Sequence, residues 1–181
     1  MKIPVLVCAG ILAVQPMFAQ LQLSALDGLA AKAKESTEIT LDAATLQLAN
    51  GFMGGAKGKD AATAKLLEKV KAIVLRTYEF SKAGQYDPGV VRTLRDQLKA
   101  QGWVKFVDLN DKEDGETFEL YSKSEEGQSK GFAMLAAEAK ELTVIYIDGQ
   151  LNLSELSGLS GQFGIPKIPL PAQGKAQKGK E

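Results

Sequence analysis

The chain has 181 residues, in which 22 Lys and Arg balance 22 Asp and Glu, with a single Cys and no His. Hydrophobic residues make up 45% and charged residues 24%, which is typical of a globular protein rather than a disordered or multi-span membrane protein. Without imidazole, and with its one thiol at Cys8, the chain lacks the groups for a His-dependent nucleophile, a His- or Cys-ligated zinc site or a disulfide. We therefore predict no metal and no cofactor.

Residues 1–19 are typical of a secretory signal peptide. Lys2 precedes an apolar run at residues 3–14, and Ala19 is a small residue at the expected cleavage point. The run is shorter than the roughly 20 apolar residues that a spanning helix needs. We expect cleavage after Ala19 and a periplasmic or secreted protein that does not span the membrane; an uncleaved anchor is the alternative. Val7 before Cys8 disfavours a lipid anchor, which needs a small residue there.

The first part of the body predicts helices and one short strand. Residues 21–36 have a helical apolar period, and residues 39–41 are a candidate strand. Asp42 and Asp60 are typical N-caps of two further helices, which the glycines at residues 51–58 separate.

The middle of the chain predicts an interior strand followed by an amphipathic helix. Residues 72–80 are β-branched and aromatic, apolar on both faces at the start, which favours a buried strand. Asp87 and Pro88 indicate a helix start, and Gly102 indicates its end. The helix is expected to bury Val91, Leu94 and Leu98 and to place Arg92, Arg95 and Lys99 on its solvated face.

The C-terminal half predicts an antiparallel meander. Turn sequences such as Asp-Gly and Glu-Gly separate four candidate strands at residues 103–109, 116–123, 129–138 and 142–148. Asn152 and Glu155 have the spacing of a capping box at the start of a short helix.

These elements define the predicted fold class and domain organisation. We expect an α+β domain at residues 20–166, with a mostly antiparallel sheet of about five strands, helices packed on one face and the four-strand meander at its C-terminal end. Residues 167–181 are rich in Pro, Gly, Gln and Lys, a composition that cannot form a core, and are expected to be a disordered tail.

Several short stretches, in their order and spacing, resemble a bacterial family known only as domain-of-unknown-function family 4252. The resemblance extends over about residues 26–166 and implies a secreted or periplasmic protein, lipid-anchored in many members, with no established activity. It supplies no catalytic residues, and this chain lacks a suitably placed Cys for the anchor. The matching stretches are residues 77–80, Trp103, residues 114–116, residues 141–144, Gly149 with Leu151, and residues 161–166.

Two segments superficially resemble ligand loops. Residues 54–58 have one residue too few between their glycines for a phosphate loop, so a flexible linker is favoured. Residues 108–116 have Lys112 and Glu113 where a calcium loop needs an oxygen ligand and Gly, so a solvated turn is favoured over an irregular calcium site.

Arg76 and Tyr78 are the first two candidate ligand-binding residues. Arg76 lies within the most apolar strand, where a buried guanidinium needs a carboxylate, and Glu119 or Asp148 would serve. An anion-binding Arg is the alternative to this structural ion pair. Tyr78 and the nearby aromatic residues belong either to the core, which is favoured, or to an aromatic groove.

Glu138 and Glu141 are the other two candidates. They flank a predicted two-residue turn, so their carboxylates should face each other, which a proton or a cation would relieve. Two close carboxylates are also what a glycosidase uses as acid and base, whereas solvated side chains at a hairpin end are the ordinary interpretation.

The function that these observations favour is an exported, non-catalytic binding or interaction domain of the bacterial cell envelope. Its partner would be a protein or another envelope component, received in one arrangement by strand addition at a sheet edge. Residues 20–166 contain 17 basic and 21 acidic side chains, and this mildly acidic charge argues against nucleic acid. No residue is assigned to catalysis. The alternatives are a carboxylate-only hydrolase acting on envelope glycans and a carrier of a small apolar ligand between sheet and helices.

Overall fold

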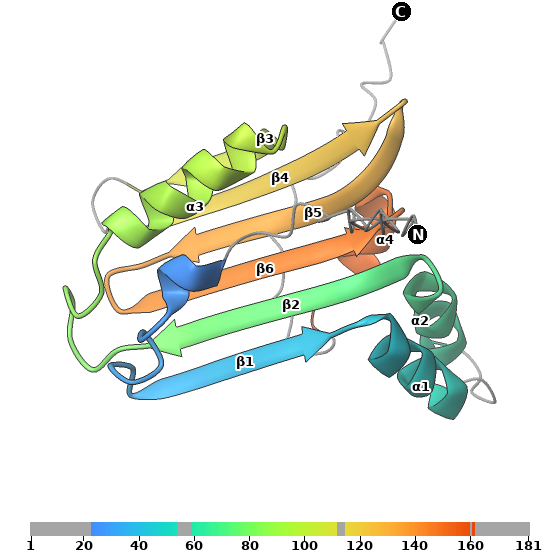
Figure 1. Ribbon diagram of the computed structural model, residues 1–181, viewed down its shortest axis with the longest axis horizontal. Helices are drawn as coiled ribbons and strands as arrows, with labels where there is room; N and C mark the ends of the chain where they lie inside the picture. Colours follow the sequence, from blue (N-terminus) through green and yellow to red (C-terminus); the bar gives the residue numbers. More distant parts are fainter. Residues whose placement is uncertain (1–22, 54–58, 112–114, 160, 162–181) are drawn as a thin grey trace, which may run out of the picture.

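The computed structural model describes residues 23–53, 59–111, 115–159 and 161 (Figure 1). The predicted signal peptide, most of the glycine-rich segment and the predicted tail lie outside these ranges. Within them, no helix is both long and apolar enough to cross a membrane.

A single six-stranded antiparallel sheet, in the order β1-β2-β6-β5-β4-β3, is the centre of the fold (Figure 1). Strands β3 to β6 form the predicted meander, and β2 is the predicted interior strand, between β1 and β6. Because the chain crosses the sheet after β2, β1 and β3 become the two edge strands. The strands are β1 (Glu35–Leu41), β2 (Val70–Glu79), β3 (Val104–Asn110), β4 (Thr117–Glu125), β5 (Gln128–Ala137) and β6 (Glu141–Gly149).

Helical segments pack against both faces of the sheet. The 3-10 helix η1 (Leu23–Leu26) and α3 (Gly89–Ala100) contribute to one apolar cluster, on the face that carries Tyr78 and Tyr121. Helices α1 (Ala43–Met53), α2 (Lys59–Leu67) and α4 (Leu153–Leu159) contribute to the other cluster, on the face that carries Leu75 and Ile145. We call these the α3 face and the α4 face.

The α+β class and the meander are confirmed, but the placement of the helices differs from the expectation of one covered face. The interior strands explain the difference. In β2, Val74 belongs to the α3 face and its neighbour Leu75 to the α4 face, and both are buried. Strands that are apolar on both faces need cover on both, because apolar side chains are stabilised by removal from water.

The predicted ends of α3 are present. The Asp87 carboxylate accepts the backbone N–H of Gly89 at 2.8 Å. At the other end Gly102 adopts a φ of 80°, and the N–H of Trp103 donates to the Leu98 oxygen at 3.0 Å. This bond satisfies a carbonyl that the helix would otherwise leave free, as glycine-terminated helices commonly do.

Two further predicted caps are also present. Asp42 Oδ1 accepts the backbone N–H of Thr45 at 2.8 Å at the start of α1. At the start of α4, Asn152 and Glu155 bond reciprocally, each side chain accepting the backbone N–H of the other at 2.9 Å. The reciprocal pair is the predicted capping box.

Candidate functional site

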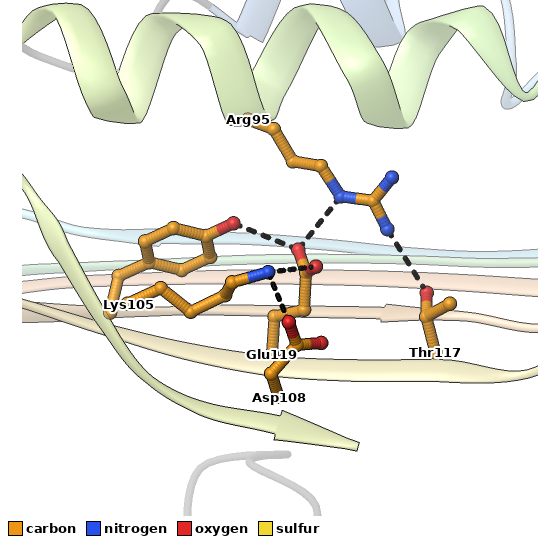
Figure 2. Close-up of polar contacts among 6 residues, drawn as sticks. Arg95, Lys105, Asp108, Thr117 and Glu119 are labelled. Carbon is orange, nitrogen blue, oxygen red and sulfur yellow. Dashed lines mark hydrogen bonds and ion pairs between the residues drawn. The ribbon is translucent and has the colours of Figure 1, made fainter. Parts of the chain in front are cut away.

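Figure 2 shows a polar cluster with a buried carboxylate, Glu119 on β4, at its centre. Only 3% of the residue is exposed. It accepts hydrogen bonds from Arg95 Nε at 2.8 Å, Lys105 Nζ at 3.0 Å and Tyr121 Oη at 2.8 Å. A buried charge needs this degree of pairing to be tolerated.

The cluster joins three elements of the fold. Arg95 reaches down from α3, Lys105 comes from the edge strand β3, and Glu119 receives both on β4 (Figure 2). Arg95 also lies 3.4 Å from Thr117 Oγ1. The predicted placement of Arg95 on the solvated face of its helix is confirmed only in part. Its side chain is 35% exposed, but a helical period does not show how far a long side chain reaches toward a buried partner.

The ionisation of Glu119 reflects two opposing effects. Burial by itself would raise the pKa of this carboxyl, but the hydrogen bonds from Arg95, Lys105 and Tyr121 outweigh it and hold the pKa below its ordinary value of 4.5. In turn, the bonds to Asp108 and Glu119 raise the pKa of Lys105 against the effect of burial. Glu119 and Lys105 are therefore both charged at neutral pH.

A surface cavity of about 240 Å³ lies next to this cluster. It is bounded by α3, the loop before it and the ends of β4 and β5, and Arg95 and Thr117 are in its wall. On the opposite side, Tyr86 Oη donates to the backbone oxygen of Glu138 at 2.6 Å, which fixes the loop to the end of β5. The cavity is thus open to solvent and has a mixed polar and apolar wall.

Glu138 and Glu141 flank the predicted two-residue turn between β5 and β6. The N–H of Glu138 donates to the backbone oxygen of Glu141 at 2.8 Å, so the turn has the predicted length. Burial raises the pKa of Glu138, and the charges of Glu116 and Glu141 raise it further. Glu138 lines the cavity, whereas Glu141 does not and instead accepts a bond from Thr143 Oγ1 at 3.2 Å.

The structure places Arg76 beside the edge strand β1, without the predicted carboxylate partner. Arg76 donates to the Ile39 backbone oxygen at 2.8 Å and to Thr40 Oγ1 at 2.9 Å. Glu119 lies on β4, three strands away from β2 in the sheet order, and pairs with Arg95, and Asp148 lies opposite Ala72 rather than Arg76. The expected ion pair was wrong because Arg76 is only partly buried, so neutral acceptors suffice.

Tyr78 belongs to the core, as the favoured interpretation had it. The residue is 1% exposed on the α3 face, and its hydroxyl donates to Glu38 Oε1 at 2.7 Å. Tyr78 and Arg76 therefore lie at the β1 side of the sheet, whereas Glu138 and Glu141 lie at the β5–β6 turn. The four predicted candidates do not form one site.

The edge strand β3 carries a second surface of interest. Four large apolar side chains are exposed in the described residues, and three of them lie on β3: Val104 at 64%, Phe106 at 41% and Leu109 at 49%. This strand pairs with β4 alone, so its outer backbone groups have no strand partner. We call Val104, Phe106 and Leu109 the β3 apolar edge.

Sequence reasoning missed the β3 apolar edge. The strand itself was expected at residues 103–109, but none of its apolar residues was predicted to be exposed. The only available signal was their number, because apolar residues at 104, 106, 107 and 109 exceed what one alternating face accommodates. A register shift between Lys105 and Val107 resolves this excess: Phe106 is a bulge residue.

These features define an α+β domain built on one antiparallel sheet, with a crossover helix that leads to an exposed edge strand. The model of the family described as Domain of unknown function (DUF4252) matches residues 31–159, and the chain belongs to this family. The family resemblance seen in the sequence is thereby confirmed. Neither the curated proteins nor the solved structures include a significant match.

Proposed function

We propose that this protein is an exported, non-catalytic interaction domain of the bacterial cell envelope, which binds a protein partner along β3. The observation that carries the proposal is the β3 apolar edge, which places most of the exposed large apolar side chains of the described residues on one edge strand. An edge strand presents unpaired N–H and C=O groups, so an added strand gains backbone hydrogen bonds while it covers apolar side chains.

The opposite edge of the sheet has the features of a protected edge. Strand β1 carries exposed charged side chains, Glu35 and Glu38, and its backbone oxygen at Ile39 accepts a bond from Arg76. Charged side chains on an edge strand disfavour pairing with another chain. Strand β3 also carries two exposed charged side chains, but Lys105 and Asp108 are of opposite sign and bond to each other, whereas the two on β1 are both acidic. Because exposed large apolar side chains lie on β3 and not on β1, the comparison supports β3 as the binding edge.

The two alternative functions have less support. A glycan hydrolase needs two carboxylates at one cavity, but of the proposed pair only Glu138 lines it. A carrier needs an apolar cavity the size of its ligand. The apolar cavity on the α4 face beside Leu156 has only about 10 Å³, which is no more than about one water molecule occupies.

The proposal is tested by photo-crosslinking in the native bacterium. A photoreactive residue at position 109 on β3 should crosslink to a protein, whereas the same residue at position 37 on β1 should not. In the purified complex, amide hydrogen exchange should slow in β3. Crosslinks from both edges alike, or none from β3, would refute the proposal.

A matched pair of substitutions distinguishes specific binding at the β3 apolar edge from nonspecific binding through any exposed apolar residue. Val104→Lys places a charge on the β3 apolar edge, and Leu48→Lys makes the same kind of change at a similarly exposed apolar residue on α1. We expect Val104→Lys to reduce the β3 crosslink at least tenfold and Leu48→Lys to leave it unchanged. Equal losses in both variants would contradict a specific edge.

A further inference from the structure

We propose that the β3 edge binds the β3 edge of a second copy of this chain, antiparallel and in one defined register. The inference rests on the proposed function, because it names the partner of the same edge. In this register a two-fold axis passes between Phe106 and Val107, and one sheet continues across both copies.

The side chains of β3 are divided by chemical type between the two faces of the sheet, with the apolar ones on the α4 face. Val107 and Leu109 pair with Leu120 and Phe118, which belong to the α4 face. The ring of Phe106 lies 6.2 Å from that of Phe132, in an edge-to-face contact, which places Phe106 on the α4 face as well.

The other face of the strand is polar. Lys105 and Asp108 both lie on the α3 face, because they pair with Tyr121 and Glu119. Residues three apart on a regular strand would point to opposite faces, so the bulge at Phe106 is what brings Lys105 and Asp108 together. By the same register Val104 lies on the α4 face and Asn110 on the α3 face, so β3 is apolar on one face and polar on the other.

In one antiparallel register, two copies of β3 place their apolar side chains on the same face of the combined sheet and their polar side chains on the other. This register pairs Val104 with Leu109 of the second copy, Lys105 with Asp108, and Phe106 with Val107, so that every pair is apolar with apolar or polar with polar. A slip by one residue in either direction sets Lys105 against an apolar residue, Val107 or Leu109. Register is strongly specified where a slip would exchange the two faces.

The charged side chains of β3 are complementary between the two copies. The register sets Lys105 directly opposite Asp108 of the second copy, and the two-fold axis repeats this pair. Oppositely charged cross-strand pairs stabilise antiparallel sheets. Within one chain Lys105 and Asp108 bond to each other, but 34% and 52% of their side chains are exposed. Both side chains are therefore accessible to form the same ion pair with the second copy.

The register is tested by mixing two cysteine variants of the full chain, Val104→Cys and Leu109→Cys, each with Cys8→Ser. In the proposed dimer the two cysteines are direct cross-strand neighbours, whereas two copies of Cys at position 104 are roughly 17 Å apart. Mild oxidation of the mixture should therefore give a disulfide-linked dimer, and each variant alone should give at least tenfold less. Crosslinking of one variant alone as readily as of the mixture would overturn the register.

Self-association itself is measured by analytical ultracentrifugation of the full chain. We expect a concentration-dependent dimer that Val104→Lys weakens at least tenfold and Leu48→Lys does not. A monomer at all concentrations would overturn this inference. If position 109 then still crosslinked a different protein in the native bacterium, the proposed function would stand without the second copy; if it crosslinked nothing, both would fall.

Discussion

Glu119 on β4 connects its own strand to helix α3 and to the edge strand β3. Its carboxylate is buried, yet it bonds to a cation from α3 and another from β3. A buried ion pair adds little to the stability of the fold when compared with apolar residues of similar size. Removal of one partner, however, leaves a buried charge unpaired, which is strongly destabilising. Here the loss would affect Arg95 and Lys105 at once.

Breaking a buried ion pair costs about 3–5 kcal/mol. Because the two cationic partners of Glu119 are 35% and 34% exposed, we expect Glu119→Ala to lower the free energy of unfolding by somewhat less, about 2–4 kcal/mol. Urea unfolding followed by circular dichroism measures the change. Glu125→Ala is the control, because Glu125 is exposed and its Lys123 and Lys130 contacts are 3.9 and 3.8 Å long; such pairs contribute at most about 1 kcal/mol. Similar losses in the two variants would contradict the argument.

The lowered pKa of Glu119 also predicts a pH dependence. A carboxyl whose pKa is lower in the folded state stabilises the fold fully above its ordinary pKa of 4.5, and this contribution is lost as the pH falls through the folded value. The stability difference between wild type and Glu119→Gln should thus be smaller at pH 3 than at pH 7. Urea midpoints at both pH values measure it, and a difference that grew toward low pH would have the wrong sign.

Gly131 on β5 allows the strand to lie close to two neighbours, the backbone of β6 and the side chain of Trp103. A Cβ at this position would collide with the backbone oxygen of Ile147 and lie 3.2 Å from the Trp103 ring. Trp103 is buried and packs edge-to-face against Tyr146 at 5.5 Å. The bare backbone of Gly131 therefore makes room for the indole.

We predict that Gly131→Ala lowers the free energy of unfolding by about 1–3 kcal/mol, as overpacking does. Gly51→Ala is the matched control: its Cβ meets open space within α1, and an Ala there should stabilise the helix by up to about 1 kcal/mol. Thermal unfolding of both variants measures the two effects. A stabilising Gly131→Ala would show that the strands separate easily at this point.

Local features of the elements could be predicted from the sequence. The caps at Asp42 and Asn152, the Gly102 helix end and the two-residue turn after Glu138 all depend on residues a few positions apart. The helix faces could be predicted only for short side chains. Val91, Leu94 and Leu98 are buried as expected, whereas Arg95 reaches a partner 24 positions away, which no local pattern encodes.

At the scale of the whole molecule, export remains a prediction of the sequence. We expect the protein isolated from its native organism to begin at Gln20, because a basic residue, an apolar run and a small residue precede that position. Intact-mass spectrometry of the envelope and cytoplasmic fractions measures this. A full-length chain that begins at Met1 in the cytoplasmic fraction would contradict both the signal peptide and the envelope location.

The α+β class, the strands of the meander, the helix caps and the family could all be predicted from the amino-acid sequence, because each depends on short-range patterns or on their order along the chain. The edge strands, the helices that cover each face and the cations that reach Glu119 could not, because they depend on contacts between distant segments. These features depend on the crossover after β2, which carries β3 to the far edge of the sheet. The interior strands bury their apolar residues on both faces, whereas on the edge strand β3 Val104, Phe106 and Leu109 are exposed to solvent.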